Sequence, residues 1–146
     1  MKTEKYVILL VEDEADDVLL IKRAFKKSNV VNPIQVAKDG EEALEYLKGI
    51  GEYHDRSKYP LPMLILLDLK LPRKSGFEVL EWLRQQPRLK RIPVVILTSS
   101  RETSDVNKAY ELGANNYLVK PVSFEALVEL AKNIQFCWLI INEHPE

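Results

Sequence analysis

The sequence lacks several features that would place it in whole classes of protein. It has a single cysteine in 146 residues, so no disulfide can form within the chain, and a reducing cytoplasm fits best. The formal net charge is −1, without the basic excess typical of proteins that bind nucleic acid or membrane surfaces. No run approaches the roughly 18 apolar residues of a membrane span. We therefore expect a cytoplasmic protein with protein partners, no nucleic-acid partner and no membrane contact.

Short apolar runs alternate with helical patterns along the chain. A length of 146 residues suits one domain with one hydrophobic core, so we predict a single domain over residues 1–146. The runs are Val7–Val11, Ile34–Ala37, Met63–Leu67, Val94–Leu97 and Tyr117–Val119. Such short runs, several of them rich in Val or Ile, are typical of strands buried on both faces. The alternation predicts an α/β fold with a doubly wound, five-stranded parallel sheet and right-handed crossovers.

Between these runs, apolar residues recur at helical spacing and predict five helices. Their expected buried faces are Val18, Ile21 and Phe25; Ala43, Leu44 and Leu47; Phe77, Leu80 and Leu83; Val106, Ala109 and Tyr110; and Leu127, Ala131, Ile134 and Trp138. Gly113 is a plausible stop signal for the fourth helix.

Polar residues follow four of the predicted strands, and the carboxyl ends of the strands are where ligands bind in such sheets. Strand one ends in Glu12 and Asp13, and strand three runs into Asp68. Strand four ends in Thr98 and strand five in Lys120. Asp68 follows an apolar run, and a buried ionised carboxylate is costly unless it is compensated. Two carboxylates about 4 Å apart repel by roughly 4 kcal/mol at an effective dielectric near 20, so three of them require a cation.

The expected crevice therefore needs positive charge, which Lys120 supplies in part and a divalent metal would supply more fully. The available ligands are hard oxygens, and no His or Cys is close in the pattern, which favours Mg²⁺ or Mn²⁺ over zinc. Aspartate forms acyl phosphates in enzymes, and phosphoryl transfer depends mainly on positioning and charge neutralisation. Asp68 is thus the predicted nucleophile toward a phosphoryl group.

Four motifs at these strand ends carry a family resemblance. They are EDE at Glu12–Glu14, LLDLKLP around Asp68, ILTSS around Thr98, and GANNYLVKP from Gly113 to Pro121. Together they resemble the receiver domain of two-component response regulators, over nearly the whole chain. The resemblance implies a flavodoxin-like (CheY-like) three-layer sandwich with strand order 2-1-3-4-5.

The resemblance also implies the chemistry of the site. Asp68 would be the phospho-acceptor, and Thr98 and Lys120 would hold the phosphoryl oxygens. Tyr117 would be a rotameric switch coupled to Thr98. The donor would be a phosphorylated histidine of a sensor histidine kinase. The chain itself supplies no plausible donor, because its two histidines, His54 and His144, lie in polar, loop-like segments. The protein would catalyse its own phosphorylation and dephosphorylation and would otherwise be no enzyme.

The metal site follows from the same resemblance. Asp13 and Asp68 would bind Mg²⁺ (or Mn²⁺) directly, and Glu12 would contribute through water. The backbone carbonyl of Lys70 would be a further ligand.

Most of these residues, taken singly, also fit an ordinary structural role. The acids of Glu12–Glu14 suit a helix N-terminus. Thr98 alone fits an ordinary strand end, and Lys120 alone a surface lysine with a buried stem. Tyr117 alone fits a core aromatic residue. Asp68 is the exception because of its apolar flanks, and the ordinary roles of its neighbours would have to coincide at four strand ends.

Three different classes of protein make other demands on the sequence. A phosphatase of the haloacid dehalogenase type would have a second acid two positions after Asp68, where Lys70 stands. A flavin-binding carrier would have a phosphate loop after strand one, but Glu12–Glu14 carry the opposite charge. An interaction module that is never phosphorylated would have lost one of the reactive groups, and all of them are present; it is kept as the alternative.

Signal output must come from the receiver itself, since too few residues remain for an effector domain. We expect the face formed by the fourth helix, the fifth strand and the fifth helix to change on phosphorylation. The long loop at 48–62, from Lys48 to Pro62, is either a surface insertion or a partner contact. The closest resemblance of these features is to small regulators of cyanobacterial phytochrome-type histidine kinases.

The apolar C-terminal segment at 136–146 is the second unusual feature. Its run from Phe136 to Ile141 is apolar on every side of a helix. We expect a symmetric homodimer through the fifth helix and this segment. The alternative is a helix that bends into its own core.

Overall fold

The structure is a computed structural model that describes the backbone of residues 6–120 and 122–142 and, within these ranges, the side chains up to residue 133. Five parallel strands form one sheet in the order β2-β1-β3-β4-β5. The elements are β1 Val7–Val11, α1 Ala15–Lys27, β2 Ile34–Ala37, α2 Gly40–Lys48, η2 Gly51–Tyr53, β3 Pro62–Leu67, α3 Gly76–Arg84, β4 Val94–Thr98, α4 Thr103–Glu111, β5 Asn116–Val119 and α5 Phe124–Asn142.

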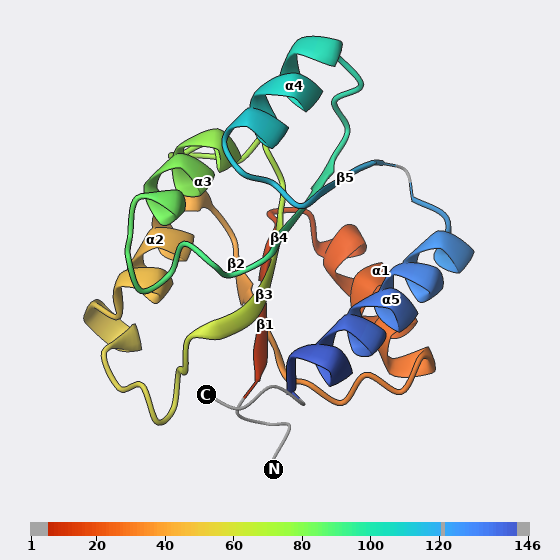
Figure 1. The fold of residues 1–146 in the computed structure, drawn as a ribbon, viewed down its shortest axis with the longest axis horizontal. Helices are drawn as coiled ribbons and strands as arrows, with labels where there is room; N and C mark the ends of the chain where they lie inside the picture. Colours follow the sequence, from red (N-terminus) through yellow and green to blue (C-terminus); the bar gives the residue numbers. More distant parts are fainter. Residues whose placement is uncertain (1–5, 121, 143–146) are drawn as a thin grey trace.

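Helices cover both faces of the sheet and make three layers (Figure 1). Helices α1 and α5 lie together on one face, and α2, α3 and α4 lie on the other. The predicted fold class and strand order are confirmed. None of the described helices is long and apolar enough to span a membrane.

The strands match the predicted apolar runs to within one residue at either end. Strands β1 and β4 are buried at every position, as expected for strands covered on both faces. Strand β3 begins one residue early, at Pro62, which pairs with Val7 before a register irregularity. Proline is tolerated there because the first residue of a strand need not donate to the ladder.

Local capping fixes where two of the helices begin. The Asp39 side chain accepts a hydrogen bond from the Glu42 N–H at 2.7 Å and caps α2. Ser75 and Glu78 form a capping box at the start of α3. Helix α2 ends at Lys48 and is capped by Gly49, whose φ of 70° is left-handed and favours glycine. Such caps hold the helices that pack beside the carboxyl ends of the strands.

The predicted buried faces are largely correct, with one error. In α5, Leu127 and Ala131 are buried as expected, whereas the predicted Ile134 and Trp138 lie outside the described side chains. In α4, Ala109 is fully buried, but Tyr110 is 46% exposed. The prediction for Tyr110 is wrong because α4 lies over β5 at the sheet edge, so a narrower stripe of the helix is covered.

The segment predicted as a long loop is folded onto α2. It contains η2, and the rings of Tyr46, Tyr53 and Tyr59 pack against one another. The centroid of the Tyr53 ring lies 5.0 Å from that of Tyr46 and 5.0 Å from that of Tyr59. The Arg56 guanidinium donates to the backbone carbonyls of Tyr46 and Leu47, both at 2.8 Å. These carbonyls belong to the last turn of α2, where the Tyr46 carbonyl also accepts from the Gly49 N–H at 3.1 Å. The segment is therefore an ordered cap on α2.

Candidate functional site

Two acidic side chains are buried where β1 and β3 end. Glu12 directly follows β1 and is 2% exposed, and Asp68 directly follows β3 and is 6% exposed. The neighbouring Asp13 is exposed. The apolar strands carry the two buried carboxylates into the protein, so each needs a compensating charge or hydrogen bonds.

The Lys120 ammonium supplies that compensation from the end of β5. Its Nζ lies 2.6 Å from Glu12 Oε1 and 3.0 Å from Asp68 Oδ2. A third carboxylate, Asp17 in α1, lies 3.0 Å away. The side chain of Lys120 is only 14% exposed, so these are charge-assisted hydrogen bonds in a partly dry site. Lys120 therefore holds three carboxylates together as well as supplying a local positive charge.

The surroundings of Glu12 and Lys120 raise the pKa of both side chains. Burial raises the pKa of Glu12, although the hydrogen bonds from Lys120 and the Glu14 N–H partly oppose it. For Lys120, burial alone would lower the pKa, but the hydrogen bonds to Glu12, Asp17 and Asp68 outweigh it and raise the pKa above its usual range. Lys120 therefore stays charged through the whole physiological range.

A buried hydroxyl without a partner faces the same end of the sheet. Thr98 is the last residue of β4 and is 0% exposed, and its Oγ1 makes no hydrogen bond with any described residue. Leaving a buried hydroxyl unpaired costs about 1–3 kcal/mol in proteins. Such a group suggests that its partner is a ligand that arrives later.

Three carboxylates come close enough to share one metal ion. One oxygen each of Glu12, Asp13 and Asp68 lie within 4.8 Å of one another. The Asp68 oxygen that does not contact Lys120, Oδ1, accepts from the Lys70 N–H at 3.2 Å, which holds the following loop against the carboxylate. Hard carboxylate oxygens with one exposed member suit Mg²⁺ or Mn²⁺, which keep several waters and take few protein ligands. The residues present fit such an ion.

Helix α3 approaches this site at Gly76. A Cβ at this position would lie 2.2 Å from the Asp68 carbonyl oxygen, far inside van der Waals contact. The Gly76 N–H donates to the Leu69 carbonyl at 2.9 Å. Glycine therefore allows the N-terminus of α3 to pack directly against the loop that carries Asp68.

Tyr117 lies between the core and the surface on β5. Its hydroxyl donates to the Ser100 carbonyl at 3.0 Å. Burial raises the pKa of the Tyr117 phenol. Ser100 in turn donates through Oγ to Asp105 in α4 at 2.6 Å. Tyr117 is thereby linked through the loop after β4 to the start of α4.

The structure brings the predicted residues together at one edge of the sheet. Glu12, Asp68, Thr98 and Lys120 are buried or nearly so, with Asp13 at the rim. Asp17 was not predicted from the sequence. It lies in the first turn of α1, whereas Asp13 precedes the helix, and its contact with Lys120 depends on how α1 packs.

Comparison with known proteins agrees with this geometry. A model of the response regulator receiver domain matches residues 8–132. The probable methanogenesis regulatory protein FilR2 of Methanothrix harundinacea is 40% identical over 97% of this chain and 89% of its own. The response regulator Rcp1 of Synechocystis is 44% identical over 91% of this chain and 88% of its own.

Two solved structures of such regulators superpose closely on most of the chain. The Mn²⁺-bound form of Rcp1 aligns with a TM-score of 0.79 at 43% identity, over 92% of this chain and 94% of its own. The phosphorylated cyanobacterial phytochrome response regulator RcpA aligns with a TM-score of 0.80 at 41% identity, over the same shares of both chains. The chain belongs to the response regulator receiver domain family.

Proposed function

We propose that this protein is a single-domain response regulator that accepts a phosphoryl group on Asp68 from a phosphorylated histidine of a sensor kinase. The observation that carries the proposal is the arrangement around Asp68. Its carboxylate is buried, the Lys120 ammonium lies 3.0 Å away, and the buried Thr98 hydroxyl at the neighbouring strand end lacks a partner among the described residues. An incoming phosphoryl group would supply an acceptor for both donors.

The transfer itself needs little covalent chemistry from the protein. The P–N bond of the phosphohistidine breaks, and a P–O bond forms to a carboxylate oxygen of Asp68. The imidazole leaves with the electron pair and takes up a proton. Lys120 would neutralise charge on the phosphoryl oxygens, and its contact at 3.0 Å together with burial holds the Asp68 carboxylate in place for the donor.

A divalent ion belongs to this proposal. Glu12, Asp13 and Asp68, with the backbone carbonyl of Lys70, would hold Mg²⁺ or Mn²⁺, with Glu12 acting through water. When bound, such an ion neutralises negative charge on the phosphoryl oxygens. Rcp1 was crystallised in an Mn²⁺-bound form, which supports the same metal class here.

The signal would leave the site through Thr98 and Tyr117. Thr98 moving toward the phosphoryl group changes the space in front of Tyr117, whose hydroxyl is tied to the Ser100 carbonyl. The face of α4, β5 and α5 would then change its equilibrium between two arrangements. Hydrolysis of the acyl phosphate resets the protein, and Lys70 and Ser100, two positions beyond Asp68 and Thr98, would flank the attacking water.

The proposed partner is a phytochrome-type histidine kinase, in the cytoplasm. RcpA, with 41% identity, is a phytochrome response regulator. FilR2 is almost as similar in sequence and is described as a regulator of methanogenesis, so the identity of the input rests on direct kinase assays. A panel of purified sensor kinases, phosphorylated with radiolabelled ATP, should transfer label fastest from a phytochrome-type member.

Phosphorylation is tested by incubating the protein with acetyl phosphate and Mg²⁺ and measuring its intact mass. Wild type should gain one phosphoryl group, and Asp68→Asn should gain none. Addition of EDTA should prevent the gain. If wild type gains no mass, or if the variant gains mass equally well, the protein is the alternative, a receiver-like interaction module that is not phosphorylated.

We also propose a homodimer through α5 and the C-terminal segment at 136–146. The apolar sequence from Phe136 to Ile141 supports this, although its side chains lie outside the described part of the structure. Light scattering across a dilution series, with and without acetyl phosphate, should show twice the monomer mass of 16.9 kDa. A monomer throughout, even at high concentration, would exclude the dimer.

A further inference from the structure

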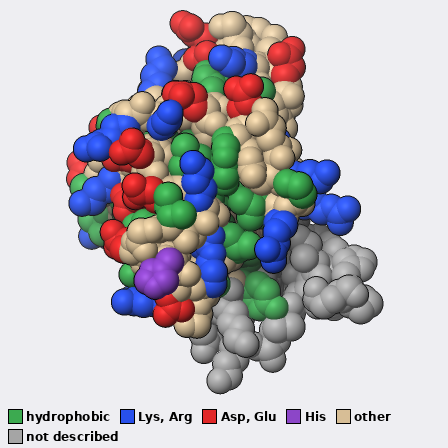
Figure 2. Space-filling model, turned by 90° about the vertical axis from the view of Figure 1, so that its left-hand side faces the viewer, with side chains coloured by type: hydrophobic (Ala, Val, Ile, Leu, Met, Phe, Trp, Pro, Cys, Tyr) green, Lys and Arg blue, Asp and Glu red, His purple; other side chains and the backbone are tan. Residues whose placement is uncertain are grey.

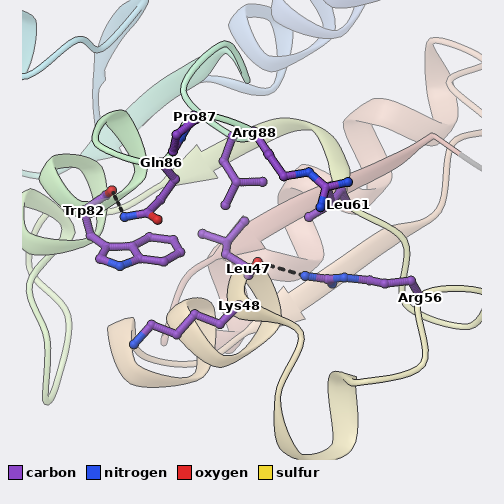
Figure 3. A pocket seen from close by; sticks show the side chains of 9 residues that line it. Leu47, Lys48, Arg56, Leu61, Trp82, Gln86, Pro87 and Arg88 are labelled. Carbon is purple, nitrogen blue, oxygen red and sulfur yellow. Dashed lines mark hydrogen bonds between the residues drawn. The ribbon is translucent and has the colours of Figure 1, made fainter.

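A basic pocket lies away from the phosphorylation site, between the ends of α2 and α3. Its volume is about 460 Å³, and it is open to solvent. Side chains from both helices and from the segments on either side point into it (Figure 3). They are Leu47, Lys48, Arg56, Leu61, Trp82, Gln86, Pro87, Arg88 and Leu89.

The pocket has an apolar floor. Leu47 and Leu89 are buried beneath it, and Leu61 is 38% exposed at its edge. Trp82 forms one wall, with its backbone carbonyl accepting from the Gln86 side chain at 3.1 Å. A half-buried indole beside leucines is a surface that an apolar anchor residue of a partner can cover.

The charges around this floor are all of one sign. Lys48, Arg56 and Arg88 line the pocket, and no acidic residue among the described side chains does. None of the three forms an ion pair with an acidic side chain in the described part of the chain. Lys48 Nζ instead lies 5.6 Å from the centre of the Trp82 ring. Figure 2 shows Lys and Arg side chains bordering exposed hydrophobic side chains on this side of the molecule, with Asp and Glu side chains elsewhere on the same face.

The folded segment after α2 builds one side of this pocket. Arg56 is held in place by three backbone carbonyls, those of Tyr46, Leu47 and Tyr59. Its position is therefore fixed before any ligand arrives, so little side-chain entropy is lost on binding. The same hydrogen bonds that cap α2 thus hold the Arg56 charge at the side of the pocket.

We propose that this pocket binds an acidic peptide segment of a partner protein that carries one bulky apolar anchor residue. The anchor would cover Leu47, Leu89 and Trp82, and flanking carboxylates would pair with Lys48 and Arg88. The pocket is open, has an apolar floor and is bordered by basic side chains. Such a surface fits a peptide better than a small molecule, which usually binds in an enclosed site. The inference is independent of phosphorylation, because it requires only the unmodified fold.

Binding is tested with a fluorescein-labelled peptide Glu-Asp-Leu-Phe-Glu-Asp, followed by fluorescence polarisation on the unphosphorylated protein. We expect saturable binding that weakens as salt is raised. In ¹H–¹⁵N spectra the Trp82 indole signal, assigned with Trp82→Phe, should shift with the titration. Peptides with Asn and Gln in place of the acids, or with Ala in place of Leu-Phe, should bind about tenfold more weakly or worse.

Matched charge reversals separate the pocket from general electrostatics. Lys48→Glu/Arg88→Glu should weaken binding about tenfold or more. Arg23→Glu/Lys27→Glu changes the net charge equally on exposed residues of α1, on the other face of the sheet, and should leave binding nearly unchanged. Circular dichroism of both variants confirms that the fold is retained.

Four results would overturn the proposal. They are no binding of the acidic peptide at millimolar concentration, equal binding of the uncharged peptide, equal loss in both double variants, and binding of oligo-dT at the Trp82 signal without peptide binding. The last result would indicate a single-stranded nucleic acid as the ligand. Because Asp68→Asn should bind the peptide like wild type, failure here is distinguishable from failure of the phosphorylation proposal.

Discussion

Replacing Thr98 by valine should stabilise the unphosphorylated protein. Valine keeps the branched shape of threonine and exchanges Oγ1 for a methyl group. Thr98 is fully buried and its hydroxyl has no partner among the described residues, so the exchange removes a buried polar group that is not satisfied. The usual expectation for a buried threonine that makes a hydrogen bond is the opposite, a loss of stability.

The magnitude follows from the cost of the unpaired group. Burying an unpaired hydroxyl costs about 1–3 kcal/mol, so we expect the free energy of unfolding to rise by about 1–2 kcal/mol. With a urea m-value of about 2 kcal/mol/M, the midpoint should move up by about 0.5–1 M. In the phosphorylated protein the order should reverse, because only threonine can donate to a phosphoryl oxygen, a hydrogen bond of about 1.5–3 kcal/mol.

Urea denaturation followed by circular dichroism measures the first effect, without acetyl phosphate. Thermal melts with Mg²⁺ and saturating acetyl phosphate measure the second. Thr103→Val, at an exposed position of α4, is the matched control and should change stability by less than about 0.5 kcal/mol. If Thr98→Val lowers the stability of the unphosphorylated protein by more than about 1 kcal/mol, the hydroxyl is paired in that state and the reasoning fails.

Three further substitutions test other parts of the structure. Arg84→Met should cost about 2–4 kcal/mol of stability, because the Arg84 guanidinium donates to the carbonyls of Gly113, Lys90 and Ile92, and urea denaturation would show it. Tyr46→Phe should flatten the loss of stability between about pH 10 and 12, since burial raises the pKa of Tyr46 from 10.0 to about 12. The contribution of the Tyr46 phenol to stability is fully present below its pKa in the unfolded protein and is lost as the pH rises through its pKa in the folded protein. Asp17→Asn should lower stability by about 0.5–1 kcal/mol at low salt, and less in 1 M NaCl, because it removes one partner of Lys120 at a partly exposed position.

Each of these substitutions has a control on an exposed residue. Arg91→Met, Tyr110→Phe and Asp16→Asn change the same chemical groups at positions exposed to solvent. Equal effects in a substitution and its control would show that the contact in question contributes nothing. For Tyr46, the comparison is made on the slope of stability against pH above about pH 10.

The sequence allowed the strands and the buried acid to be predicted because both depend on local pattern. Apolar runs buried on both faces predicted β1 and β4 almost residue by residue. Asp68 had to lie near a cation because its flanks are apolar, and Lys120 is that cation. The predicted residues of the site met because parallel strands bring their carboxyl ends to one edge.

Other features depend on how elements dock, and the sequence does not show this. Tyr110 has helical spacing to Val106, yet α4 contacts too little of the sheet to bury it. The contact of Asp17 with Lys120 requires the observed rotation of α1 on the sheet. The tyrosine packing after α2 has no period, because Tyr46, Tyr53 and Tyr59 come from a helix, a short turn and an irregular segment.

The hydrogen bonds of the tyrosine-packed segment are local, although Tyr46 and Tyr53 also belong to the core that packs against β1 and β3. These hydrogen bonds are short in sequence, such as that from the Tyr46 hydroxyl to the Pro60 carbonyl across 14 residues, and they end on α2 rather than on the site around Asp68. Contacts of such low sequence separation cost little loop entropy when they form. Substitutions at exposed positions of this segment, such as Lys58, can therefore accumulate without altering phosphoryl chemistry, whereas the buried Tyr53 is constrained by the core. Regulators that share one reaction could in this way diverge in what they recognise.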